Sequence, residues 1–122
     1  MARIFELNRK STLALRQRKQ AILRQLRVPA DVLRASFVKQ FLTCGKPACP
    51  CHKSQDHKHG PYYYLLLCLA TGRIRKFSLK DPQQQQQARQ GAAAYSQFME
   101  SVEELSQINA ELLRRGDSIQ AQ

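Results

Sequence analysis

The sequence of 122 residues predicts an α+β fold with an N-terminal helix, a small three-stranded antiparallel sheet and a long C-terminal helix. Helical periodicity occurs near both ends of the chain, and runs rich in β-branched and aromatic residues lie between them. A cluster of Cys and His residues separates the first of these runs from the second. We therefore expect three segments: a basic helical segment at 1–35, a Cys- and His-containing β-sheet at 36–80 and a long helix at 81–122.

The first helix is predicted between residues 8 and 27, with Asn8 or Ser11 as its N-cap and Pro29 after its end. Leucine and isoleucine recur there at helical spacing, so one stripe of the helix faces a core. The stripe is surrounded by seven cations with no acidic residue among them: Arg9, Lys10, Arg16, Arg18, Lys19, Arg24 and Arg27. Salt bridges within the helix cannot compensate these charges, which favours a phosphate-binding face over a merely solvated one.

Three runs predict the strands of the sheet, at residues 36–43, 62–70 and 73–79. The last two flank the turn Thr71-Gly72 and form a β-hairpin signal. Both faces of the middle run are apolar, so we expect it to be the central strand.

The last helix is predicted to begin at Pro82, directly after the N-cap Asp81. Its apolar positions follow a heptad, with Asn109 at one a position: Tyr95, Phe98, Val102, Leu105, Asn109 and Leu112. Three arrangements fit this pattern. The helix crosses the sheet and its second half frays or packs on the first helix, it forms an antiparallel hairpin with that helix, or it forms a coiled-coil homodimer whose register Asn109 sets.

The chemistry of the chain is concentrated between residues 44 and 59. Three cysteines there follow C-x4-C-x-C spacing, and three histidines follow them: Cys44, Cys49, Cys51, His52, His57 and His59. Disulfides are not expected of an odd thiol cluster in a chain without a signal sequence, and no acid is placed to orient a catalytic Cys–His pair. Zinc accounts for the whole cluster, because a structural zinc site uses four thiolate or imidazole ligands. The sequence thus predicts a zinc knuckle.

Three residues compete to be the fourth ligand beside the three cysteines. His59 is favoured because it lies where the loop returns to the next strand. His57 can replace it, and Cys68 is a further alternative, although a cysteine in mid-strand reads more simply as a small buried hydrophobe. His52 is awkwardly placed next to Cys51.

Two sequence blocks, Cys44-Gly-Lys-Pro47 with the two cysteines that follow and His59-Gly-Pro-Tyr62, occur in order. In these blocks the chain resembles a family of short uncharacterised prokaryotic proteins with a C-G-K-P-x-C-x-C … H-G-P-Y signature, many of them encoded near transposases. The resemblance spans roughly residues 34–113. It implies a zinc-knuckle fold, a mobile-element context and Cys44, Cys49, Cys51 and His59 as the shared set, but no reaction.

The net charge of +11 is unevenly distributed along the chain. Residues 1–80 carry 17 Lys and Arg against three acidic residues, whereas residues 81–122 carry three against six. A basic body of this kind favours nucleic acid, DNA or RNA, as partner. The expected contacts are Arg16, Arg18, Lys19, Lys46, Arg73, Arg75 and Lys76, and we expect the clusters around Arg16 and Arg73 to lack acidic neighbours.

The alternative function is a protein-interaction module or inhibitor that docks onto a larger nuclease or transposase through the long acidic helix. Catalysis is not expected, because the sequence contains no HExxH, no phosphate-binding loop and no paired carboxylates for a metal-assisted nuclease. No apolar run is long enough to cross a membrane, and we expect a cytoplasmic protein.

Overall fold

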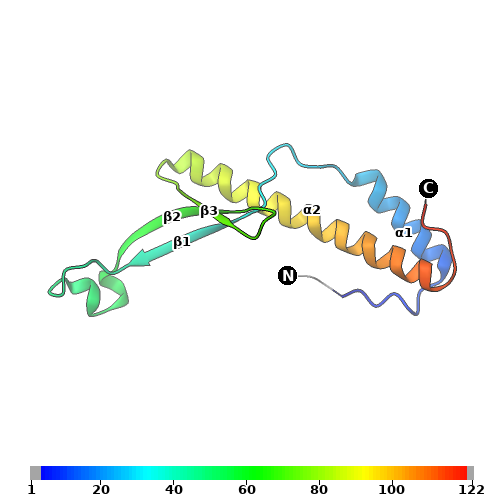
Figure 1. Ribbon diagram of the computed structural model, residues 1–122, viewed down its shortest axis with the longest axis horizontal. Helices are drawn as coiled ribbons and strands as arrows, with labels where there is room; N and C mark the ends of the chain where they lie inside the picture. The colour runs from blue at the N-terminus through cyan, green and yellow to red at the C-terminus, as the bar shows by residue number, and fades with distance from the viewer. Residues whose placement is uncertain (1–3, 121–122) are drawn as a thin grey trace. The chain divides into compact units, whose positions relative to one another are not determined.

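The computed structural model describes residues 4–120 and confirms the α+β fold, with the Cys and His cluster in the sheet region (Figure 1). Its elements in chain order are α1 (Thr12–Gln25), β1 (Ala35–Leu42), the 3-10 turns η1 (Pro50–His52) and η2 (Gln55–His57), β2 (His59–Cys68), β3 (Ile74–Ser78) and α2 (Pro82–Arg114). Among the described residues, no helix combines the length and the hydrophobicity needed to span a bilayer.

The chain forms two compact units. Of the described residues, the helical unit contains 4–30 and 96–120, and the sheet unit contains 31–95. The helix α2 therefore contributes its first residues to the sheet unit and its last residues to the helical unit.

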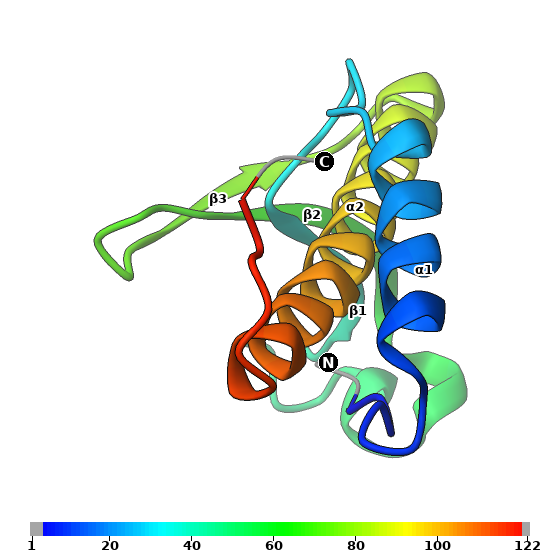
Figure 2. The same cartoon turned by 90° about the vertical axis from the view of Figure 1, so that its right-hand side faces the viewer.

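In the helical unit, α1 lies antiparallel to the C-terminal part of α2 (Figure 2). Of the two caps considered, Ser11 is the one used, and its hydroxyl accepts a hydrogen bond from the main-chain N–H of Ala14. The predicted apolar stripe of α1 forms the core together with α2 and the preceding segment: Leu7, Leu15, Ile22, Ile108 and Leu112. The second half of the long helix thus packs on the first helix, as one of the expected arrangements requires.

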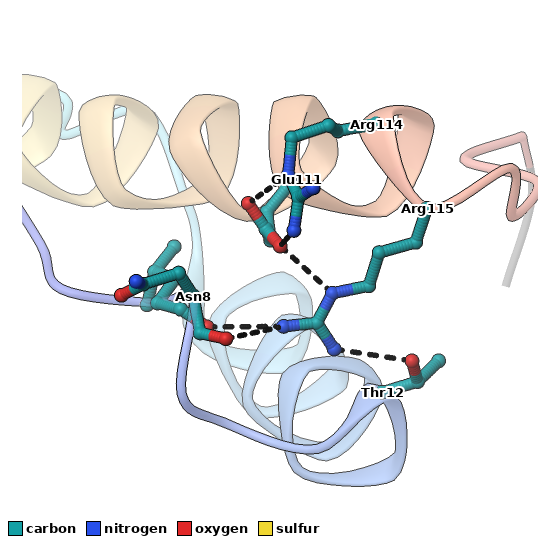
Figure 3. A network of polar contacts seen from close by, with 6 residues as sticks. Asn8, Thr12, Glu111, Arg114 and Arg115 are labelled. Atoms are coloured by element: carbon teal, nitrogen blue, oxygen red, sulfur yellow. Dashed lines mark hydrogen bonds and ion pairs between the residues drawn. The ribbon is translucent and has the colours of Figure 1, made fainter.

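A polar network closes the end of this unit, with Arg115 at its centre (Figure 3). The Arg115 guanidinium donates to Glu111 at 2.8 Å, to the Thr12 hydroxyl at 3.2 Å and to the main-chain carbonyl of Asn8 at 3.3 Å. Glu111 also accepts from Arg114 at 2.6 Å. Hydrogen bonds from Arg114 and then from Arg115 lower the pKa of Glu111 to about 2. The network ties the segment before α1 to the last turn of α2.

The sheet unit has the strand order β1-β2-β3, antiparallel throughout, with β2 in the centre as predicted. Leu65 of β2 lies opposite Phe37 on one side and Phe77 on the other. The two ladders have different lengths. β1 pairs with β2 from His59 to Leu67, whereas β3 pairs with it only from Tyr64 to Cys68. Next to the Cys and His cluster, the sheet is therefore a two-stranded ribbon.

The first residues of α2 lie on one face of the sheet, which we call the covered face. The Arg89 guanidinium lies 4.9 Å from the ring centre of Phe37, and both Leu65 and Ala88 are buried. The helix also approaches the chain before β1, where the main-chain N–H of Leu33 donates to the carbonyl of Gly91 at 3.1 Å. This contact and the apolar covered face hold the sheet against the helix.

The opposite face, which we call the open face, is formed by the alternate residues of the same strands, since directly paired residues point to the same side. None of its side chains is buried: Ser36, Val38, Gln40, Tyr62, Tyr64, Leu66, Cys68, Ile74, Lys76 and Ser78.

Candidate metal centre

The four predicted ligands meet in the knuckle, residues 44–59, at the end of the sheet where β1 ends and β2 begins (Figure 1). Cys44 follows β1, and Cys49 and Cys51 flank Pro50, the first residue of η1. His59 is the first residue of β2. The proline favours the tight turn between the two cysteines because its fixed φ suits the start of a helical turn. Antiparallel pairing of β1 with β2 then brings the returning histidine back to the cysteines.

The ligand atoms of Cys44, Cys49, Cys51 and His59 all lie within 4.8 Å of one another. The Sγ atoms of Cys44 and Cys51 are 3.7 Å apart, and Cys49 Sγ lies 3.4 Å from His59 Nε2. A tetrahedral zinc ion with ordinary bond lengths separates two sulfurs by about 3.8 Å, and a sulfur from a nitrogen by about 3.6 Å. Two of the ligand pairs therefore already have nearly the separations of a tetrahedral zinc site, and the four residues together could hold a metal ion. No other such group occurs among residues 4–120.

Two features of the main chain support the cluster. The N–H of Cys44 donates to the sulfur of Cys51 at 3.3 Å, and the Cys51 side chain is fully buried. This hydrogen bond fixes the Cys51 sulfur beside Cys44. Gly60, next to His59, has a φ of 127°, and a Cβ atom there would lie 2.8 Å from the carbonyl oxygen of Gln40. Glycine thus permits the close approach of β1 and β2 beside the ligand.

The other candidates for the fourth ligand lie outside the cluster. His57 Nδ1 forms a hydrogen bond with the Ser54 hydroxyl at 2.6 Å, and Cys68 lies at the opposite end of β2 with its side chain exposed. His52 has a role that the spacing did not suggest, because its Nε2 lies 3.0 Å from the main-chain oxygen of Cys44. It braces the ligand loop from outside, as outer-shell partners of metal sites do.

The basic residues of β3 and its turn, Arg73, Arg75 and Lys76, are all exposed. Arg75 lies with its guanidinium carbon 5.2 Å from the ring centre of Phe77, and Lys76 places Nζ 4.0 Å from that of Tyr64. Within residues 4–120, the ion pairs found all belong to the helical unit, so these cations have no acidic partner there. Lys46 is likewise exposed, in the knuckle.

The expectation of no acidic neighbours is wrong for the cluster on α1. Arg18 forms a bidentate ion pair with Glu104, in which both nitrogen–oxygen distances are 2.7 Å. The guanidinium of Arg16 lies 3.5 Å from the carboxylate of Asp117. Lys19 is only 6% exposed, and its ammonium donates to the main-chain oxygen of Ile119 at 2.7 Å. The groups that contact these three cations belong to residues between 86 and 101 positions away in the sequence, so the sequence of the helix itself does not reveal them.

A family model described as a domain of unknown function, DUF6788, matches residues 12–88. The chain belongs to this family. The matched part runs from the start of α1 through the whole knuckle and the sheet to the first turns of α2. Membership in a family of uncharacterised function is what the resemblance implied. No curated protein and no solved structure is significantly similar to the chain.

Proposed function

We propose that this DUF6788 protein is a zinc-stabilised, non-enzymatic accessory protein that binds nucleic acid through its sheet unit. The observation that carries the proposal is the pair of exposed cations on β3, Arg75 and Lys76, which have no acidic partner and lie over aromatic rings of the same sheet. The resemblance to proteins encoded near transposases supports a function as an accessory protein of a mobile element or of a defence complex. Thiol ligands persist in a reducing compartment, which supports a cytoplasmic location.

Zinc is supported by the chemistry and the spacing of the donors. Three sulfurs and one imidazole at these distances are the donor set of closed structural zinc sites. A closed set leaves no position for a substrate or a catalytic water, which supports a structural role. The site is built from Cys44, Cys49, Cys51 and His59, and zinc supplies rigidity there rather than a reaction.

The zinc proposal is tested by the metal content of protein purified under reducing conditions. We expect one equivalent of bound zinc per chain. The Cys49→Ser variant should lose this zinc, whereas the Cys68→Ser variant should keep it. The two variants make the same chemical change, one inside the cluster and one outside it. Less than half an equivalent in the unmodified protein, or equal loss in both variants, contradicts the assignment.

Nucleic-acid binding is supported by where the excess charge lies. The sheet unit carries ten Lys and Arg residues against three Asp residues, a balance of +7. Its exposed cations are not neutralised by neighbours, so they remain available to phosphates, and each phosphate contact releases condensed counterions. Arg75 rests over the ring of Phe77, which restrains its side chain and reduces the entropy lost on binding.

The test is binding to labelled DNA and RNA at several salt concentrations. The double variant Arg75→Glu with Lys76→Glu should weaken binding and lower the slope of log affinity against log salt by about 0.7–0.9 for each phosphate that is no longer neutralised. The matched control is Arg9→Glu with Arg24→Glu, which makes the same charge change at exposed positions of the helical unit. No binding at micromolar protein in low salt, or equal weakening by both variants, refutes the β3 interface.

The alternative, docking through the acidic part of α2, has less support. Glu104 is paired with Arg18, and Glu111 is paired with Arg114 and Arg115. These carboxylates are already neutralised by arginines of the helical unit, so they would attract a basic protein partner only weakly.

A further inference from the structure

The open face of the sheet provides a binding surface for bases, and the following inference rests on the proposed function. We infer that the nucleic acid is single-stranded at this surface, with unpaired bases stacking on Tyr62 and Tyr64 while Lys76 of β3 binds an adjoining phosphate.

The first argument is the exposure of an aromatic and apolar surface. Tyr62 is 43% exposed and Ile74 is 61% exposed, while Val38, Tyr64 and Leu66 are half-buried. These side chains adjoin one another across the paired strands and leave aromatic and apolar surface open to a ligand. On the covered face, by contrast, the ring of Tyr63 already stacks on the ring of Phe37, with ring centres 5.6 Å apart, so Tyr63 has an aromatic partner within the protein.

The second argument is charge. The open face carries Lys76 and no acidic residue, and it lies in a unit with an excess of seven positive charges. An apolar protein partner does not need this excess, whereas a polyanion does. A surface that combines cations with aromatic rings is the arrangement by which proteins bind single strands without sequence preference.

The third argument is the spacing of the two tyrosines. Residues two apart on a strand are separated by about 6.8 Å, about twice the 3.4 Å rise of each strand in B-form DNA. Two successive bases can reach both rings only if the bases are unstacked from each other. A duplex keeps its bases paired and stacked inside the helix, so it cannot use this surface without opening.

Lys76 connects base binding to phosphate binding. In the free protein its ammonium lies over the ring of Tyr64, 4.0 Å from the centre. A base that stacks on Tyr64 takes this place, and the displaced ammonium moves to the phosphate of the same strand. The lysine therefore covers the aromatic ring until the strand arrives.

The experiment compares one short single-stranded oligonucleotide, as DNA and as RNA, with the duplex that it forms with its complement. We expect tighter binding of the single strand. Tyr62→Ala should weaken that binding between about fivefold and a hundredfold, as stacking energies per base imply, while Tyr62→Phe keeps the affinity. The matched control is Phe41→Ala. Phe41 is 42% exposed, and Lys39 lies over its ring on the covered-face side of β1. This variant should bind normally.

The intrinsic fluorescence gives an independent readout. The chain has four tyrosines and no tryptophan, so stacked bases should quench tyrosine emission, and Tyr62→Ala should remove part of the quenching. Duplex bound as tightly as single strand, or Tyr62→Ala binding like the unmodified protein, overturns this inference and leaves the proposed function standing. Dimerisation that protects Tyr62 also overturns it. Absence of binding to every probe refutes the proposed function itself.

Discussion

The contact between α2 and the chain before β1 predicts that Gly91→Ala destabilises the sheet unit. A Cβ atom at this position would lie 2.5 Å from the carbonyl oxygen of Asp31, and 2.7 Å from Cδ1 of Leu33. The first of these is a main-chain atom, so the clash is relieved only by moving the backbone that leads into β1. That movement also strains the hydrogen bond from the Leu33 N–H to the Gly91 carbonyl.

The expected change in the free energy of unfolding combines one stabilising effect with two destabilising effects. Alanine is favoured over glycine inside a helix by about 1 kcal/mol. Overpacking of this kind costs about 1–3 kcal/mol, and a broken hydrogen bond costs about 0.5–1.5 kcal/mol. We therefore expect a net loss of about 1–3 kcal/mol in the free energy of unfolding.

The assay is urea denaturation followed by circular dichroism at a fixed zinc concentration. The matched control is Ala93→Gly, at an exposed position of the same helix, which should cost about 1 kcal/mol through helix propensity alone. If Gly91→Ala is as stable as the unmodified protein or more stable, the close approach of the two segments is refuted.

Three further predictions concern the core, the metal and pH. Ile108→Ala removes a fully buried side chain of the helical unit and should cost about 2–5 kcal/mol in denaturant unfolding, with a cost below about 1 kcal/mol contradicting the described core. Chelation under reducing conditions should unfold the knuckle, because structural zinc contributes about 10–16 kcal/mol in small peptides, and an unchanged circular dichroism spectrum after complete zinc loss would argue against this. The lowered pKa of Glu111 stabilises the fold above its ordinary pKa near 4.5, and this stability is lost as the pH falls toward 2. Between pH 5 and pH 3, the free energy of unfolding of Glu111→Gln should therefore fall less than that of the unmodified protein. The same fall in both proteins would contradict the network of Figure 3.

Much of the fold could be predicted because its signals are local. The helical spacing of Leu15 and Ile22 identifies the buried stripe of α1, and the apolar faces of residues 62–70 identify the central strand. The Cys and His cluster was equally predictable, since three of its members lie within eight residues and the fourth lies where the chain must return to the sheet.

The environment of the α1 cations could not be predicted in this way. Arg18 and Glu104 are 86 residues apart, and Arg115 and Thr12 are 103 apart. Nothing in the local pattern of α1 shows which distant carboxylates will pack beside it. The same limit applies to the open face: alternation along β2 makes both faces apolar, and only the position of α2 distinguishes the occupied face from the free one.

The unequal ladders of the sheet have a consequence for its motions. Between His59 and Tyr62, the central strand pairs with β1 alone, and a two-stranded ribbon is only marginally stable in water. One end of the ribbon adjoins the cluster of Cys44, Cys49, Cys51 and His59, and the other end is paired with the third strand. Amide hydrogen exchange should therefore be slow along all of β2 in the zinc-loaded protein. After zinc removal, protection from exchange should disappear first near His59 and persist longest between Tyr64 and Cys68. The two-stranded part of the sheet would therefore unfold progressively from the end that contains His59.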